Sequence, residues 1–510
     1  MNNIASKVSV ITVIALIGKI MGILRDRMQG VYFGTYSVEG IAFTQASMLP
    51  RLFLDVMFAS VLSASFIPVF NKILQTKGKE AAFDLAASFV KVVFIITIVF
   101  TAFTIIFADP IYGLFFYDPA VALEVRPLAV RLLRLMLPII VISSLAFSFT
   151  GILQSLGQFN IPAAMSVASN GIILVYYLLL MERFGVYGLA VAFLIGWSSQ
   201  ALIQVPFLLK HRSLTGWFFE PVSANKLKDI GKLTLPVMVA SWLAPVNFFV
   251  NARASLGLYG GQHGFVAINM AHTLYTVITG VVVLSLANVL FPQLAKLAAD
   301  NDLKEYAGTL KSSLRGLLFV LIPMTFGLMA VAQPLVRLVF EGGRFQQDSV
   351  QITATALFYF SIGIVGFGLQ VILSRACFAL QDGKGPLIAA IVAIIVNAVL
   401  SFTLAPIMQI AGPALASAIA ISLAGLILFI RLCKKTPQLL WDISMTLNTA
   451  KILILSMAMY LVVVFFLGVF SGVLIAIPIA VGVGVYVVGC LLLQVPEAKM
   501  VIQVALAHIK

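Results

Sequence analysis

The apolar segment VSVITVIALIGKIMGILRDRM (8–28), together with a second apolar run from Ile41 to Phe70, decides the fold of this chain. Lys19 lies eleven residues after Val8. This is about 16 Å along a helix, or about mid-depth in a bilayer core about 30 Å thick. A charge at that depth is expensive, so it usually faces a watery cavity or a charged partner. The segment therefore predicts a membrane-spanning helix that carries a cation toward a pocket for an anion.

Further charged residues mark both helices as candidates for that pocket. The first helix carries Arg25 and Asp26 near its far end, and the second carries Arg51 and Asp55, with Glu39 just before it. Two simpler interpretations stay open. The cluster at 25–27 has the features of an interfacial group that reaches toward lipid headgroups, and Arg51 and Asp55, one helical turn apart, have the spacing of a self-neutralising pair.

The composition excludes a soluble globular protein. Of 510 residues, 61% are hydrophobic and 10% are charged, whereas soluble domains carry about 25% charged residues. The net charge of +14 is explained mainly by Lys and Arg retained on the cytoplasmic face. A nucleic-acid partner is not expected, because no basic segment is long or interleaved with aromatic residues. The N-terminus lacks the cleavage pattern of a secretory signal, so the first span is expected to be retained.

Reading apolar runs of about 20 residues against charged breaks predicts an all-α polytopic membrane protein with fourteen transmembrane helices. The runs centre on 8–28, 41–69, 83–108, 128–153, 162–181, 187–209, 229–255, 265–291, 308–333, 352–379, 387–407, 411–432, 449–469 and 474–494. Basic residues concentrate in alternate breaks, and the opposite breaks hold little beyond Arg27, Arg126, Arg183 and Arg344. This bias predicts that both termini lie in the cytoplasm.

An internal repeat divides the chain. FIPVFNK (66–72) resembles LFPQLAK (290–296), and LQSLGQFNIP (153–162) resembles ALQDGKGP (379–386). Pro68 thus corresponds to Pro292 and Pro162 to Pro386, at the same offset in both cases. The offset equals six spans, so the copies are parallel repeats with a site between them. We expect an N-lobe at 1–210, a cytoplasmic linker at 211–228, a C-lobe at 229–435, and a terminal helix pair with a tail at 436–510.

The second lobe is poorer in charge. Arg253 lies near the outer end of the seventh span, which also carries Asn251, while His272 and Thr273 lie in the eighth. We expect Arg253 to contribute to the cationic pocket and the other three to line it as polar residues. A hydrogen-bonded packing role for His272 remains the alternative. No nucleotide-binding loop, no metal-binding motif and no catalytic triad is present in the sequence, and its three cysteines have no metal or disulfide spacing.

At these residues the sequence resembles the MurJ/MviN family, the lipid II flippases of the MOP exporter superfamily. GKIMGILRD (18–26) is similar to the family motif SRxLGxxRD, and Met48-Leu49-Pro50 and FIPVF (66–70) also fit. In the second lobe, LVFEGGRF (338–345) resembles LFxxGxF, and FALQDGKGP (378–386) resembles the short cytoplasmic signature before the eleventh span.

The resemblance implies a cationic cleft for a diphosphate. Arg25 stands at a family cavity arginine, Lys19 stands where the family usually has Arg, and Glu39 stands where it usually has Asp. The sequence departs from the family pattern at Leu54 and at Ala271-His272-Thr273-Leu274, where family arginines are missing. Lys19, Arg25, Arg51 and Arg253 are therefore expected to hold the diphosphate. Asp26, Glu39 and Asp55 are expected to be supporting acids.

With this resemblance we expect a flippase, not an enzyme; the resemblance implies that it moves undecaprenyl-diphosphate-linked peptidoglycan precursor (lipid II) from the inner to the outer leaflet by alternating access. The resemblance implies a tail groove near the last two spans, the bacterial cytoplasmic membrane as location, membrane lipids as further partners, and no cofactor. A monomer is expected, and the coupling ion stays open. The alternatives are a flippase for another polyprenyl-linked glycan, a MATE-like cation-coupled exporter, and, from other classes, a membrane enzyme or a scaffold.

Overall fold

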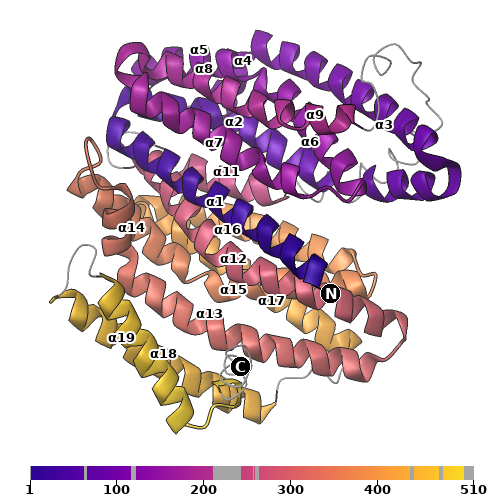
Figure 1. Ribbon diagram of the computed structural model, residues 1–510. Helices are drawn as coiled ribbons and strands as arrows, with labels where there is room; N and C mark the ends of the chain where they lie inside the picture. Colours follow the sequence, from indigo (N-terminus) through magenta and orange to yellow (C-terminus); the bar gives the residue numbers. More distant parts are fainter. Residues whose placement is uncertain are drawn as a thin grey trace. The chain divides into compact units, whose positions relative to one another are not determined.

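The computed structural model of the chain is built of helices (Figure 1). It describes residues 2–61, 66–116, 122–210, 243–256, 258, 263–436, 442–469 and 475–498. Across these ranges no residue belongs to a named β-strand, and the one isolated bridge joins Gly342 to Phe345. The prediction of an all-α protein is confirmed.

Two compact units divide the chain: Met1–Phe249 with Gly260–Val266, and Val250–Tyr259 with Ala267–Lys510. The division falls inside α11 and α12, whereas the predicted linker at 211–228 lies outside the described residues. The helices up to this division are α1 (Asn2–Phe33), α2 (Val38–Val61), α3 (Ile67–Ile106), α4 (Ala108–Phe116), α5 (Ala122–Met136), α6 (Ile139–Ser155), α7 (Asn160–Leu179), α8 (Met181–Leu202) and α9 (Val205–Leu209).

The remaining helices begin with the two that the division crosses. They are α11 (Leu243–Ala254), α12 (His263–Ala299), α13 (Leu303–Phe340), α14 (Gln347–Ser361), α15 (Ile364–Ala379), α16 (Lys384–Met408), α17 (Ala411–Lys435), α18 (Ile443–Leu467) and α19 (Ala476–Leu492). In the second unit α16 packs on α17, and α18 packs on both α13 and α19. The last two helices are drawn in yellow in Figure 1.

The helix breaks follow the sequence repeat. Asn160 begins α7 and Lys384 begins α16, at the same offset that relates Pro162 to Pro386. This offset also relates the left-handed Gly78 inside α3 (φ 86°) to Asp302, the residue that caps α13. The break between α5 and α6 has its counterpart between α14 and α15, which are bent by 47°. The repeat therefore extends from sequence motifs to backbone geometry.

The packing of unit 1 explains one of these motifs. In FIPVF (66–70) the rings of Phe66 and Phe70 are fully buried, with centroids 5.5 Å apart. Phe66 also packs on Phe89, and Phe70 packs on Phe83. Together with apolar side chains of α6, these rings form one core cluster. The motif thus ties the start of α3 to the body of the unit by hydrophobic burial.

The exact number of spans is not confirmed. Within the described residues nine helical stretches are long and apolar enough to cross a membrane, and the bent pair formed by α14 and α15 makes a tenth. The shorter α19 is also apolar. This set of helices supports the interpretation of the chain as a polytopic membrane protein.

Candidate functional site

The surroundings of the α1 residues proposed for the pocket are set by how closely α1 approaches α7. A side chain at Gly18 would collide with Ser166 of α7, and one at Gly22 would lie 3.6 Å from the Asn170 amide. Two glycines four residues apart therefore let the two helices pack closely, as a Gly-x-x-x-Gly spacing permits. This close approach brings the polar end of α1 against Asn170.

Arg25 sits at the centre of the resulting polar cluster. Its Nε and Nη2 atoms donate to Oδ1 of Asp26 at 3.0 and 2.8 Å, and its Nη1 donates to Oδ1 of Asn170 at 3.0 Å. The Asn170 amide in turn donates to the Gly18 carbonyl at 3.2 Å. The guanidinium carbon also lies 5.7 Å from the centroid of the Phe193 ring. Arg25 is thus held from α1, α7 and α8.

This arrangement orients the cation and partly neutralises it. The side chains of Arg25 and Asp26 are 15% and 14% exposed, so the pair is mostly shielded from solvent. A guanidinium has five N–H donors, and the contacts above occupy three of them. An anion bound here would meet a preorganised planar donor, which suits phosphate oxygens. It would also meet the opposing charge of Asp26.

Lys19 lies on a different side of α1. Six residues separate it from Arg25, which is about 600° of helix rotation, so the two side chains leave the helix in different directions. Lys19 is exposed, on a surface that also carries exposed Leu16 and Ile20. The structure therefore places one anchored and one exposed cation on a single helix, and joint binding of a diphosphate stays a prediction.

In α2 the candidates have separate surroundings. Arg51 donates to the Ser47 hydroxyl at 2.6 Å and to the Ser47 carbonyl at 3.2 Å. Glu39 is exposed in the first turn of α2, where the helix dipole stabilises a negative charge. The side chain of Asp55 lies outside the described residues, so its predicted pairing with Arg51 remains a prediction.

The second unit has a polar cluster of its own around Asn251. The Asn251 amide donates to the hydroxyl of Ser417 at 3.0 Å, and its Oδ1 accepts from Asn397 at 2.8 Å and from Ser401 at 3.2 Å. Asn251, Asn397 and Ser401 are nearly or fully buried. These contacts join α11 to α16 and α17 through neutral groups. Asn251 is therefore a packing partner whose amide is already satisfied.

The other candidates in this unit lie on α11 and α12. Arg253 is half-buried near the end of α11. The His272 ring packs against Phe360 and Tyr275, with centroids 5.7 and 6.2 Å away, and the Thr273 hydroxyl donates to the Asn269 carbonyl of its own helix. The aromatic contacts of His272 fit the packing alternative. The predicted assembly of these residues with Lys19 and Arg25 in one cleft stays a prediction.

Sequence reasoning missed a third cluster at the α15–α16 turn. Asp382, 4% exposed, accepts from Arg431 at 2.6 Å and from Lys435 at 2.8 Å, and its Oδ1 accepts the Gly385 backbone N–H at 3.2 Å. The hydrogen bond from Arg431, with help from Lys435, holds the pKa of the Asp382 carboxyl well below its usual range. Asp382 belongs to the signature FALQDGKGP (378–386). Its ion pairs with Arg431 and Lys435, called the latch below, therefore hold this turn against the end of α17.

Sequence and structure comparisons identify the family. The family model "Lipid II flippase MurJ" matches residues 31–482. A "Probable lipid II flippase MurJ" of Rhizobium tropici is 26% identical over 454 residues, which is 88% of this chain and 84% of that protein. A "Lipid II flippase MurJ" of Burkholderia cenocepacia is 27% identical over 431 residues, which is 82% of each chain.

Two solved structures share the fold. The first is "Lipid II flippase MurJ, inward closed conformation", with a TM-score of 0.78 and 23% identity, covering 94% of this chain and 97% of that chain. The second is an inward-facing multidrug resistance MATE transporter of the MOP superfamily, with a TM-score of 0.72 and 16% identity, covering 84% of this chain and 98% of that one. The family model spans most of the sequence, and this chain therefore belongs to the lipid II flippase MurJ family.

Proposed function

We propose that this chain carries lipid II across the bacterial cytoplasmic membrane, from the inner to the outer leaflet. The observation that carries the proposal is the family match over residues 31–482, and the anchored guanidinium of Arg25 supports it with a physical rationale. Undecaprenyl diphosphate bears the negative charge of the substrate, and arginine is well suited to bind diphosphate oxygens in a fork geometry.

In this proposal the transport cycle needs no catalytic residue and no cofactor. The diphosphate enters from the cytoplasm and pairs with Lys19 and Arg25, while Arg51 and Arg253 add positive charge. Asp26 keeps Arg25 oriented when the site is empty, and Glu39 and Asp55 act as further supporting acids. The two lobes then rock to expose the headgroup to the other side, which is the expectation for transporters built from repeats.

The oligomeric state and the membrane topology are part of the proposal. The chain acts as a monomer. Both of its termini lie in the cytoplasm, because basic residues concentrate in the breaks that this topology places inside. A cation-coupled exporter is the second candidate, favoured by the fold shared with a MATE transporter. The basic residues at 19, 25 and 27 favour an anionic lipid over a cationic drug.

The proposal is tested by flipping in vesicles. The purified protein is reconstituted with fluorescent lipid II, and outer-leaflet lipid is quenched over time. We expect transport by the native chain and loss of at least about tenfold in Arg25→Ala, because hydrogen bonds to charged groups contribute about 1.5–3 kcal/mol each. Arg344→Ala, which changes an exposed arginine of another loop, is the control. If vesicles that contain the native protein fail to move lipid II, or move a cationic drug instead, the proposal is refuted.

A further inference from the structure

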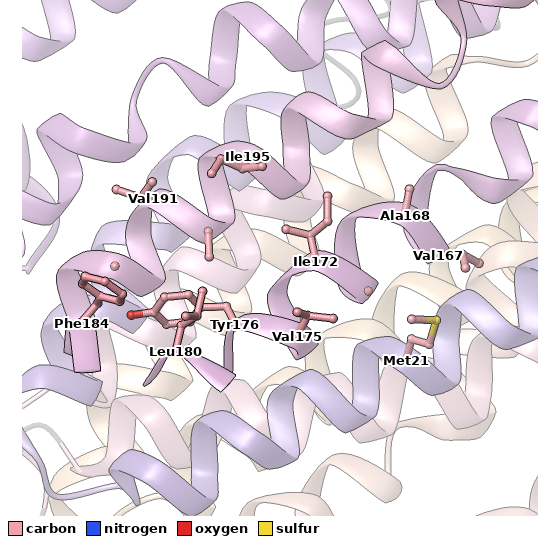
Figure 2. A pocket seen from close by; sticks show the side chains of 13 residues that line it. Met21, Val167, Ala168, Ile172, Val175, Tyr176, Leu180, Phe184, Val191 and Ile195 are labelled. Atoms are coloured by element: carbon pink, nitrogen blue, oxygen red, sulfur yellow. The ribbon is translucent and has the colours of Figure 1, made fainter. Parts of the chain in front are cut away.

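An apolar groove of about 800 Å³ runs along unit 1 between α1, α7 and α8 (Figure 2). Met21 of α1 lies on one side, Val175 of α7 and Val191 of α8 lie on the others, and almost all of the lining is apolar. Gly171 and Gly188 also line the groove. A side chain at Gly171 would touch Met21, and one at Gly188 would collide with Tyr176 and Phe184, so both glycines are required by the packing of the groove wall. A hydrocarbon chain is the ligand chemistry that such a surface fits.

The length of the groove limits which hydrocarbon chain can fill it. Its lining extends from Val167 on α7 to Leu180, the residue that follows α7, thirteen residues or about 20 Å along the helix axis. One leaflet of the bilayer core is about 15 Å deep, and the acyl chain of a phospholipid ends near that depth. A chain that occupies the whole groove must therefore continue past the midplane, as a polyprenyl chain does.

A cation stands at one end of the groove. Phe184 lines the groove at the turn from α7 to α8, and the guanidinium carbon of Arg183 lies 5.4 Å from its ring centroid. Arg183 is exposed. The Tyr176 hydroxyl donates to the Gly185 carbonyl at 2.7 Å and fixes this turn. A phosphate at the head of a chain in the groove would therefore meet an arginine on a rigid rim.

The groove is also linked to the anchored cation. Met21 lies one helical turn before Arg25 on α1, and Gly171 follows Asn170 on α7. The Arg25–Asn170 hydrogen bond therefore fixes the spacing of two of the three groove helices. Any shift of α1 against α7 that alters this bond also alters the groove.

We propose that this groove binds the polyprenyl chain of the lipid once the headgroup has reached the outer leaflet, when the diphosphate has left Lys19 and Arg25 and lies beside Arg183. The proposal rests on the proposed function, and on the predicted topology the Arg183 end faces the outer leaflet. The sequence resemblance suggested a tail groove near the last two helices. There, side chains at Gly482 and Gly489 would collide with Val463 and Leu455 of α18, so α18 and α19 are in close contact at those points.

Photo-cross-linking tests the position of the tail. The full chain carries a benzophenone amino acid at Val175, which lines the groove, or at Leu178, which is exposed on the same helix but is not part of the lining. Each protein is reconstituted in phosphatidylglycerol and phosphatidylethanolamine vesicles with radiolabelled undecaprenyl diphosphate. We expect about tenfold more label at Val175, because burial contributes about 0.8 kcal/mol per CH₂.

The outcomes separate the groove from the proposed function. Equal labelling at both positions, or capture of labelled phosphatidylglycerol in preference to the polyprenyl probe at Val175, would overturn the groove. If the native chain still flips lipid II in that case, the function stands without it. An absence of lipid II flipping by the native chain would instead refute the function.

A filling substitution provides the second test. Val175→Trp should slow lipid II flipping by about tenfold, while Leu178→Trp on the same helix leaves the rate unchanged. Arg183→Gln should reduce cross-linking at Val175, and Arg183→Lys should retain part of it. Thermal unfolding of each variant shows that the fold is intact. Normal flipping in a folded Val175→Trp variant would contradict the proposal.

Discussion

Nη1 of Arg25 donates to Oδ1 of Asn170 across 3.0 Å and so joins α1 to α7. In the second unit Nδ2 of Asn397 donates to Oδ1 of Asn251 across 2.8 Å and joins α11 to α16. Asn251 lies 226 residues after Arg25 and Asn397 lies 227 residues after Asn170, whereas the repeat offset is 224, so the two pairs belong to corresponding helices but not to corresponding positions. Each lobe therefore has its own polar clamp between these helices, with a cation in the first lobe and neutral groups in the second.

Removing the amide of Asn170 should loosen α1. Asn170→Ala leaves Nη1 of Arg25 and the Gly18 carbonyl without this partner, and losing such bonds destabilises by about 1–3 kcal/mol. We expect a lower unfolding temperature in detergent and slower lipid II flipping. Leu179→Ala, at a residue that is 74% exposed on the same helix, is the control. Native stability in Asn170→Ala would show that the clamp is dispensable.

Removing the negative charge beside Arg25 should strengthen anion binding. Asp26→Asn keeps a side chain of similar shape but frees the guanidinium from its counter-charge. Since partly exposed ion pairs contribute up to about 1 kcal/mol, we expect undecaprenyl diphosphate to bind about fivefold tighter, as measured by titration in nanodiscs. Weaker binding in a folded Asp26→Asn variant would mean that Asp26 is needed to shape the site.

The latch at the α15–α16 turn should depend on pH. The pKa of Asp382 is depressed, so its stabilising contribution is present above the unfolded value of about 3.9 and is lost as the pH falls toward the folded value. We expect the unfolding temperature of the native chain to fall below about pH 4, by more than that of Asp382→Asn. At pH 7 Asp382→Asn should already be less stable. The exposed Asp300 gives the control Asp300→Asn, and identical acid profiles for the native chain and Asp382→Asn would contradict the latch.

The neutral clamp of the second unit should behave as a structural element. Asn397→Ala removes one donor to Asn251 and should destabilise by about 1–3 kcal/mol. Ser401→Ala removes the other donor, and the two changes should be non-additive because both donors share Oδ1 of Asn251. A double-mutant cycle of thermal unfolding measures this coupling. Strictly additive effects would show that the two donors act independently.

The sequence was sufficient for the helical membrane fold and for the repeat. The apolar runs are long and the prolines recur at a constant offset, so both signals can be seen without coordinates. The spacing of Gly18 and Gly22 indicates that another helix can approach the first one closely, but only the structure identifies that helix as α7. The span count was less accessible, because broken helices such as α14 and α15 cannot be distinguished from straight ones by hydropathy.

The partners of the charged residues could not be predicted from the sequence. Asn170 and Asn397 lie in apolar helices and do not interrupt the hydropathy pattern, although a buried amide among apolar residues needs a hydrogen-bond partner. That requirement was the signal available for finding them. In the sequence Arg431 and Lys435 are two basic residues at the end of an apolar run, and nothing in that pattern indicates that both pair with Asp382. These pairings depend on tertiary packing.

The central claim is that cations of the first helix hold the diphosphate of lipid II during transport. The direct measurement depletes the native protein in its host, supplies Lys19→Ala or Arg25→Ala, and follows the exposure of lipid II to an external probe in cells without another flippase. The account predicts that depletion abolishes outer-leaflet lipid II and that neither variant restores it despite normal expression. Full exposure of lipid II during depletion, or full restoration by both variants, would contradict it.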